Sequence, residues 1–234
     1  MLSKTRAVVF RNTNYSESSV ISKVYTREFG LRSYMFKGIR KGKSAIRPSM
    51  IQPLNIVDMD VYYRPNSNIN SVKDLKPTLL LFDTQENMSK KSVALFMLEV
   101  LNQCITEEEC EEELFDFIEA EIMDLENSIL SPLKPITFML ELAKHLGVIP
   151  NGNHTESTPY LCLEQGRFVR DIGLHTASLS VSSLLSELKN GNCINQVDGA
   201  IRREALNQIS KYYQYHITKN KKLNSTEILA ELLS

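Results

Sequence analysis

The hydrophobic pattern of the chain changes its period after about the first eighty residues. Before that point the apolar residues come in short β-branched or aromatic runs, separated by clusters of Asn, Ser, Gly and Pro such as NTNYSES, EFG and RPNSN. Such runs are typical of strands joined by tight turns. From about Asn87 onward the apolar residues recur at i, i+3, i+4 and i+7, the spacing of a helix with one buried face. The pattern therefore predicts strands first and an all-α body after them.

Five segments of the first part have the composition of strands, the fifth more weakly than the others. They read RAVVFRNT, SSVISKVYT, LRSYMFKG, NIVDMDVYYR and SVKDLKPTLLL. Five short strands at this spacing favour a small closed or nearly closed barrel. The predicted fold class is α+β and multidomain, with a five-stranded β-barrel over residues 1–82 and an all-α helical domain over residues 83–234.

Five helices are expected after the barrel, over residues 88–105, 106–126, 131–147, 195–217 and 224–233. Ser89 is the expected N-cap of the first, and Thr106 with Glu109 fits a capping box at the second. Gly147 stands where the C-cap of the third is expected. Residues 151–176 then break the helical spacing with Gly, Pro and alternating apolar residues, which predicts an irregular insert or a small β-hairpin.

The two parts of the chain carry opposite charge. Residues 1–80 hold 14 Lys and Arg against 5 Asp and Glu, and residues 81–234 hold 13 against 23, although the whole chain has a net charge of only -1. A strongly basic module is typical of proteins that bind polyanions, although clustered lysines also keep a β-rich domain in solution. No acid stands between Phe29 and Val57, so the positive charge is least diluted there.

The segment FKGIRKGKSAIRPSM, residues 36–50, contains GKS and so suggests a phosphate-binding loop. Such a loop needs G-x-x-x-x-G-K-[ST] between a strand and a helix, because its glycines let backbone N–H groups surround the phosphates. Here Lys37 stands at the first glycine position, and Gly38 is one residue too close to Gly42. Pro48 would also interrupt the helix that should follow. The pattern argues against a nucleotide-binding loop.

The side chains that usually carry catalysis or bind metals are scattered along the chain. The four histidines and four cysteines form no HxxxH, HxxE, CxxH or CxxC pair, and no serine has the glycine neighbours of a nucleophile elbow. The cysteines are expected to be reduced and mostly buried. The acidic run EEECEEE projects its carboxylates around a helix, which indicates a solvated helix start rather than a cation site. We predict no catalytic residue, no metal site and no cofactor.

Aromatic residues accompany the basic segment. Single-stranded nucleic acids suit this combination, because phosphates require positive charge and exposed bases stack on flat rings. Tyr34 and Phe36 are more often core residues in such a place, whereas Tyr25, Tyr62 and Tyr63 lie on neighbouring predicted strands. The predicted nucleic-acid-binding residues are Arg32, Lys37, Arg40, Lys41, Lys43 and Arg47.

The ordered combination of these segments resembles the RecO family of bacterial recombination mediators and DNA repair proteins. The resemblance is carried by TRAVVFRNTNYSESSVISKVYTREFGLRSYMFKGIRKGKS with IQPLNIVDMDVYYR, by SVALFMLEVLNQCI, by FMLELAKHLGVIP and by YYQYHITKNKKLNSTEIL, and it spans essentially the whole chain. It implies an N-terminal OB-fold, a helical bundle, no catalytic site, and the binding and annealing of DNA. It also places the family's basic strand and loop on Arg32, Lys37, Arg40, Lys41 and Lys43.

The resemblance departs from the family pattern in the insert. Many RecO proteins bind zinc there through four cysteines, in a stretch that corresponds to about residues 151–176. Only Cys162 stands in this stretch. We therefore expect a degenerate insert without structural zinc.

The partners implied by the resemblance are single- and double-stranded DNA, RecR, RecA and the C-terminal tail of single-stranded DNA-binding protein. In most bacteria that tail is acidic and ends in an aromatic residue and a carboxylate, so its docking site needs nearby Lys or Arg. The candidates are Arg202, Arg203, Lys219, Lys221 and Lys222. Exposed lysines at a helix end more often only offset the helix dipole.

Two functions stay open at this point. The first is a non-enzymatic DNA-binding mediator of recombination and repair, and the second is an OB-fold RNA-binding or scaffold protein that acts through its helical domain. Strand annealing distinguishes them, whereas salt-dependent binding is common to both. The chain has no apolar run of membrane-spanning length, and its N-terminus reaches polar residues too early for a signal-peptide core, so we expect a cytoplasmic, nucleoid-associated protein without membrane contact.

Overall fold

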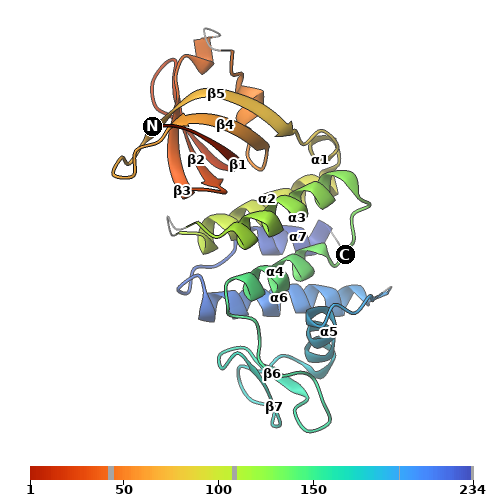
Figure 1. Ribbon diagram of the computed structural model, residues 1–234. Coiled ribbons are helices and arrows are strands. Elements are labelled where there is room, and N and C mark those ends of the chain that lie inside the picture. The colour runs from red at the N-terminus through yellow and green to blue at the C-terminus, as the bar shows by residue number, and fades with distance from the viewer. Residues whose placement is uncertain (42–44, 107–109, 195, 233–234) are drawn as a thin grey trace. The chain divides into compact units, whose positions relative to one another are not determined.

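The structure is a computed structural model, and it describes residues 1–41, 45–106, 110–194 and 196–232 (Figure 1). It contains two compact units. The first comprises Met1–Ala94 and Ile105–Ile129, and the second comprises Leu95–Cys104 and Leu130–Ser234. The predicted division at residue 82 follows the change from strands to helices, whereas these units follow the packing. Within the described residues no helix combines the length and the apolar character needed to cross a membrane.

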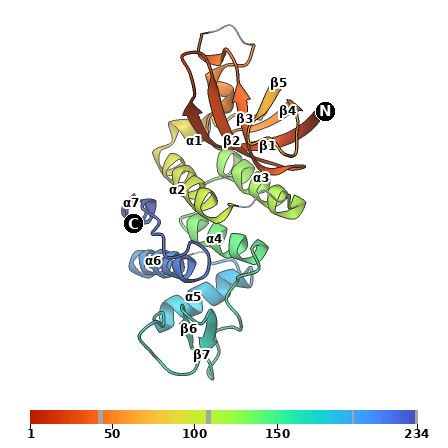
Figure 2. The ribbon, with the colours of Figure 1, turned by 90° about the vertical axis from the view of Figure 1, so that its left-hand side faces the viewer.

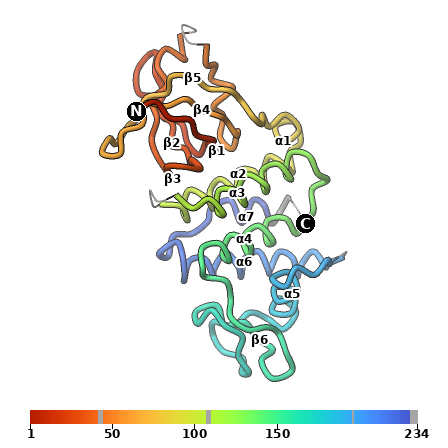
Figure 3. The backbone as a smooth tube through the Cα atoms, viewed as in Figure 1, coloured from red at the N-terminus to blue at the C-terminus, as the bar shows by residue number. Residues whose placement is uncertain are grey.

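The first unit contains the five predicted strands. They are β1 (Leu2–Asn14), β2 (Val20–Thr26), β3 (Gly30–Phe36), β4 (Ile56–Tyr62) and β5 (Asn70–Leu79). They pair in the order β1-β2-β3-β5-β4, and β1 also pairs with β4, so the sheet closes into a barrel (Figure 3). All of these pairings are antiparallel except the short one between β3 and β5, which aligns Tyr34 with Asn70 and Met35 with Ser71. This is the five-stranded OB-fold arrangement, as expected.

Alternate residues of each strand fill the barrel. The core includes Val9 of β1, Val24 of β2, Tyr34 of β3 and Val57 of β4, each fully buried. Three isoleucines from the connection between β3 and β4 complete it: Ile39, Ile46 and Ile51. Burying each of these side chains contributes about 1.5–3 kcal/mol relative to an exposed position. They anchor the short helices η1 (Ile39–Lys41) and η2 (Pro48–Ile51), and with them the segment that carries the cationic run.

Helix α3 (Glu112–Asn127) covers part of the barrel's outer surface (Figure 2). Tyr25 lies between Phe10 and Phe115, with both ring-centroid distances at 6.0 Å, and all three side chains are buried. Phe115 is buried, whereas Phe117 of the same helix is only half-buried. The helix begins at Glu112, so Thr106 does not cap it, and Glu109 lies outside the described residues.

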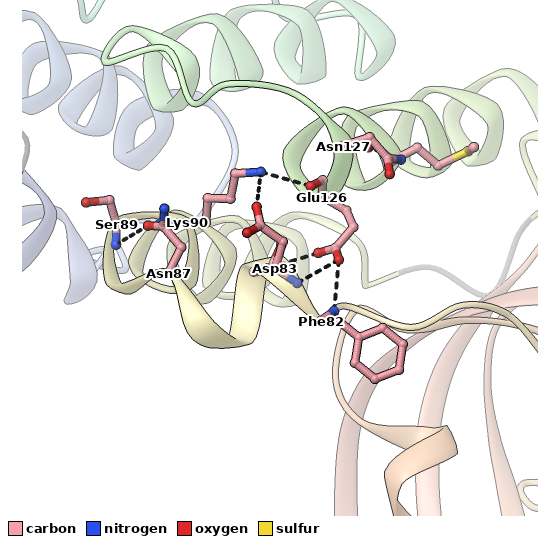
Figure 4. Close-up of polar contacts among 9 residues, drawn as sticks. Phe82, Asp83, Asn87, Ser89, Lys90, Glu126 and Asn127 are labelled. Carbon is pink, nitrogen blue, oxygen red and sulfur yellow. Dashed lines mark hydrogen bonds and ion pairs between the residues drawn. The ribbon is translucent and has the colours of Figure 1, made fainter.

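A network of polar contacts joins the end of the barrel to the helices of the same unit (Figure 4). The Glu126 carboxylate accepts the backbone N–H groups of Phe82, Asp83 and Thr84 at 2.9, 2.8 and 3.0 Å, at the start of α1 (Asp83–Glu86). The side chain of Lys90, a residue only 5% exposed, donates from Nζ to the Glu126 carbonyl oxygen at 2.8 Å and pairs with Asp83 at 2.5 Å.

Helix α2 (Met88–Cys104) begins where the sequence predicts, but with a different cap. The Asn87 side chain accepts the N–H groups of Ser89 and Lys90 at 3.0 and 3.1 Å, so Asn87 rather than Ser89 is the N-cap. Asn is at least as good a cap as Ser, and its side chain reaches the second and third residues after it.

The second unit is helical with a small hairpin. Its elements are the end of α2, α4 (Lys134–His145), β6 (Tyr160–Cys162), β7 (Arg167–Val169), α5 (Leu179–Lys189), α6 (Gly199–His216) and α7 (Ser225–Leu232). Gly147 follows α4 with a φ of +70° and donates to the Lys144 carbonyl oxygen, as expected of a C-cap glycine. The hydroxyl of the fully buried Tyr213 in α6 donates to the Met139 carbonyl oxygen in α4 at 2.5 Å.

Helix α5 was not predicted. Its apolar residues Val181, Leu184, Leu185 and Leu188 have helical spacing, but the intervening serines obscure it. Two of these serines are buried and bond to the predicted insert: Ser182 Oγ accepts the Leu161 N–H at 2.9 Å, and Ser186 Oγ accepts the His154 N–H at 3.0 Å. The insert itself forms the expected hairpin of β6 and β7.

Candidate nucleic-acid interface

The outer side of β1, β2 and β3 carries exposed cations at the strand ends that α3 leaves free. Arg11 of β1 lies directly opposite Lys23 of β2, and Lys23 lies opposite Ser33 of β3. Both cationic side chains are exposed, because residues on this side alternate with the core residues of each strand. The sequence did not single out either residue. The strand pattern left the faces unassigned, and only the pairing register places the two cations together.

The cationic run continues from this side of the barrel. Lys37 follows β3 and is exposed, and the next residue is Gly38, whose φ of +72° turns the chain away from the strand. Such a positive φ favours glycine over any residue with a Cβ. Ile39 then inserts into the core and leaves Arg40 and Lys41 on the surface. Burial of Ile39 therefore leaves the two predicted cations that follow it exposed to solvent.

Two of these cations contact the hairpin between β1 and β2. Arg40 Nη1 donates to the Ser16 carbonyl oxygen at 2.8 Å, and Lys41 Nζ lies 2.8 Å from a carboxylate oxygen of Glu17. The backbone N–H of Arg40 also donates to the Ser18 carbonyl oxygen. These contacts hold the run against the hairpin. We call Arg11, Lys23, Lys37, Arg40 and Lys41 the basic face.

The remaining predicted site residues differ in their placement. Arg47 is exposed at the start of η2, and Lys43 lies outside the described residues. Arg32 is half-buried, and on β3 it shares the side of Tyr34 and Phe36, which are core residues. The structure therefore places Arg32 on the inner side of its strand and not on the basic face.

The aromatic residues near the basic segment are mostly packed inside the unit. Tyr25 contacts Phe115 of α3, and burial raises the pKa of Tyr25 to about 12. Tyr63 stacks on Phe29 with ring centroids 3.9 Å apart, whereas Tyr62 is 48% exposed. The exposed ring beside the basic face is Tyr15, which is 62% exposed and precedes Ser16 in the hairpin. Sequence reasoning missed it, although its position between turn residues was a usable signal.

Other cations of the barrel are engaged by acids of α3. Arg6 pairs with Asp58 at 2.8 Å and with Glu119 at 3.2 Å, and Arg27 pairs with Asp116 at 3.0 Å. The hydrogen bond from Arg6 holds the pKa of Asp58 below its usual range. Arg6, Arg27 and Asp58 line a hollow of about 570 Å³, which Asp60 and Asp74 also line. Because cations and carboxylates are mixed there, the hollow lacks the excess of positive charge that the basic face has.

The candidate docking residues of the second unit lie at opposite ends of α6. Arg202 and Arg203 are in its first turns and line a small apolar depression with Pro135, Leu206 and Leu229. Arg202 also borders an adjoining hollow of about 460 Å³.

The lysine group follows the end of the same helix. Lys219 and Lys221 are exposed, and Lys222 pairs with Glu227 at 2.6 Å. A helix of this length separates the arginines from the lysines by about 25 Å, so the structure does not bring the two groups together.

The insert shows no metal site within the residues that the structure describes, where no three His, Cys, Asp or Glu side chains are grouped suitably. Cys162 is buried, and His154 Nδ1 lies 2.9 Å from the Pro159 carbonyl oxygen. Lys189 Nζ contacts the carbonyl oxygens of Pro150 and Gly152 at the base of the insert. Hydrogen bonds from the main chain and from Lys189 therefore hold the base of the hairpin.

Comparisons with known proteins cover nearly the entire chain. The family model "Recombination protein O N terminal" matches residues 1–80, and "Recombination protein O C terminal" matches residues 85–226. The chain is 28% identical to the DNA repair protein RecO of Flavobacterium psychrophilum, over 99% of both chains. It is also 28% identical to the proteins of that name from Azobacteroides pseudotrichonymphae, over 98% of both chains, and Phocaeicola vulgatus, over 100% of both.

Proposed function

The chain belongs to the RecO family of DNA repair and recombination proteins, and on this premise we propose that it is a non-enzymatic mediator that binds and anneals single-stranded DNA. The observation that supports this proposal is the basic face. Its five cations come from two strands and one loop, and α3 does not cover them. An exposed ring, Tyr15, lies beside them. Cations with an adjacent ring suit a single strand, whose phosphates need charge and whose bases stack.

The proposed mechanism of annealing is electrostatic. Two complementary strands repel each other through their phosphates, and a protein that neutralises some of these phosphates lowers that repulsion and raises the local concentration of strands. In this mechanism the basic face does not recognise the edges of particular bases. Binding is therefore independent of sequence, and no bond is made or broken.

The same proposal includes partners. We propose that RecR and RecA act with this protein on strands coated by single-stranded DNA-binding protein, in the cytoplasm near the nucleoid. The arginine depression on α6 is the better of the two docking candidates for the acidic tail of that protein. Its apolar side chains, Pro135, Leu206 and Leu229, suit the aromatic residue at the end of the tail. Arg202 and Arg203 suit the carboxylate beside that residue.

The test compares DNA binding and annealing in matched variants. Each lost phosphate contact lowers the slope of log affinity against log salt by about 0.7 for a single strand. The double variant Arg11→Ala/Lys23→Ala should therefore lose about 1.4 units of slope, and Arg40→Ala/Lys41→Ala/Lys43→Ala should lose up to about 2. Lys73→Ala/Lys76→Ala on β5 is the matched control, because both lysines are exposed but lie outside the basic face.

The result separates the mediator from its alternative. If the native protein does not accelerate annealing of complementary single strands, alone or with single-stranded DNA-binding protein present, the mediator function is wrong and RNA binding or a scaffold role gains support. If annealing occurs but neither variant changes the salt slope, the DNA site lies elsewhere on the protein.

A further inference from the structure

A hollow lined by polar and aromatic side chains lies in the second unit, between α6 and the insert. Its volume is about 310 Å³. Helix α6 contributes Gln208, Lys211 and Tyr215, which follow one another at helical spacing on one face. The insert contributes Leu174 and His175, and the turn after α6 contributes Asn220.

Hydrogen bonds between the insert and α6 fix the walls of this hollow. His216 Nε2 lies 2.7 Å from the Leu163 carbonyl oxygen, and the Leu163 N–H donates to the His175 carbonyl oxygen at 2.8 Å. The Tyr215 hydroxyl lies 3.0 Å from His175 Nδ1, and the two rings meet edge to face. The insert therefore serves as a wall that is attached to α6 through His216 and Tyr215.

The polar groups of the hollow are available to a ligand. Among the described residues, the side-chain amides of Gln208, Gln214 and Asn220 and the ammonium of Lys211 have no hydrogen-bond or ion-pair partner. Each amide presents a donor and an acceptor side by side, the arrangement that pairs with the edge of a nucleobase. Lys211 supplies one positive charge, as a single phosphate needs.

The apolar groups of the hollow are exposed as well. Leu174 is 92% exposed, although leucine gains free energy from burial, and Tyr215, which also lines the hollow, is 43% exposed. An exposed tyrosine ring can stack on a base. The volume is at the lower end of small-ligand sites and is sufficient for one nucleotide.

We propose that this hollow binds one nucleotide of a single-stranded DNA. The base of that nucleotide contacts Tyr215 and the side-chain amides, and its phosphate contacts Lys211. The inference rests on the proposed function for the class of ligand, and it adds a contact that holds a strand by its base. An acidic peptide fits less well. Lys211 is the one lysine among the described residues that line the hollow, and Glu164 lies 3.9 Å from His175 beside it, so several carboxylates would not be neutralised.

The experiment uses the full chain with two probes of equal length, an oligodeoxyadenylate and an abasic strand with the same phosphates. The native protein should bind the base-containing strand more tightly. Tyr215→Ala should weaken binding of that strand by about 5-fold or more and leave the abasic strand unchanged, since stacking is lost but charge is not. Tyr215→Phe keeps the ring and should bind like the native protein.

A second pair of variants tests the amides. Gln208→Ala should weaken binding of oligodeoxyadenylate, whereas the control Asn207→Ala, which removes an exposed amide on α6 outside the hollow, should not. Thermal denaturation of each variant shows that a loss of binding does not come from unfolding.

These experiments distinguish failure of this inference from failure of the proposed function. If the native protein binds neither probe, the proposed function and this inference are both wrong. If it binds both probes through the basic face but Tyr215→Ala and Gln208→Ala bind them as the native protein does, only the inference is wrong. Binding of an aspartate-rich peptide that Tyr215→Ala abolishes, with strand binding unchanged, would assign the hollow to a protein partner and also overturn it.

Discussion

Replacing Glu126 tests the packing of the first unit most directly. Its carboxylate accepts three backbone N–H groups, from Phe82, Asp83 and Thr84, at the point where the barrel ends and α1 begins (Figure 4). A side chain that caps a helix start in this way contributes about 0.5–2 kcal/mol, and hydrogen bonds to a charged group contribute about 1.5–3 kcal/mol. Glu126 is only half-buried, so water replaces part of each bond.

We expect Glu126→Ala to lower the free energy of unfolding by about 2 kcal/mol, and Glu126→Gln by about half of that, because the amide keeps one neutral acceptor. For a chain of this size, about 2 kcal/mol corresponds to a fall in the thermal midpoint of about 4–8 °C. Thermal denaturation followed by circular dichroism measures it. Glu86→Gln is the matched control, since Glu86 is an exposed glutamate of α1, the helix whose start Glu126 caps.

The pH dependence gives a second measurement of the same interaction. Partial burial alone would raise the pKa of Glu126, but hydrogen bonds from Thr84, Asp83 and Phe82 outweigh it and hold the pKa below its usual range. A carboxyl with a lowered folded-state pKa contributes stability above its unfolded pKa of about 4.3 and loses it as the pH falls through the folded pKa. The difference between native protein and Glu126→Gln should be constant near neutral pH and shrink in acid below about pH 4. Equal stability at neutral pH, or a difference that persists in acid, would refute the reasoning.

Three further predictions concern other parts of the chain. Tyr213→Phe removes the buried hydroxyl that donates to the Met139 carbonyl oxygen and should cost about 1 kcal/mol in urea unfolding; no loss would show that the bond adds no net stability. Glu17→Gln removes the carboxylate beside Lys41 and should tighten single-strand binding by about 1.5- to 5-fold at low salt, with less gain at high salt; an unchanged affinity contradicts a competing role for Glu17. Metal analysis of the purified protein should find no stoichiometric zinc, because Cys162 is the only cysteine in the insert, and a full equivalent of zinc per chain would contradict this.

The barrel could be predicted from the sequence because its strands are short, rich in β-branched residues and separated by turn residues, and the resemblance to RecO indicated the OB-fold. The basic face could be predicted only in part. The cations after Phe36 stand together in the sequence, but Arg11 and Lys23 join them only through the pairing of β1 with β2. Arg32 stands shortly before Phe36, and strand alternation places it on the opposite side of β3, the side of Tyr34.

Helix α5 shows why polar residues at buried positions mislead a periodicity argument. Ser182 and Ser186 face the insert because their hydroxyls accept backbone N–H groups that would otherwise be unsatisfied. The sequence alone shows two serines in an apolar stripe. Their partners, Leu161 and His154, stand more than twenty residues earlier, so the reason for the serines is visible only in the tertiary structure.

The cover that α3 provides has a consequence for synthesis of the chain. The outer residues Phe10 and Tyr25 belong to the first two strands, but their cover, Phe115, is translated much later. At a rate of about 5–20 residues per second, roughly 2–9 s pass between residue 82 and the end of α3. During that interval a completed barrel presents an aromatic surface on the nascent chain. A ribosome-bound barrel should therefore be a substrate for chaperones until α3 emerges, and a fragment that ends at residue 82 should be prone to aggregation.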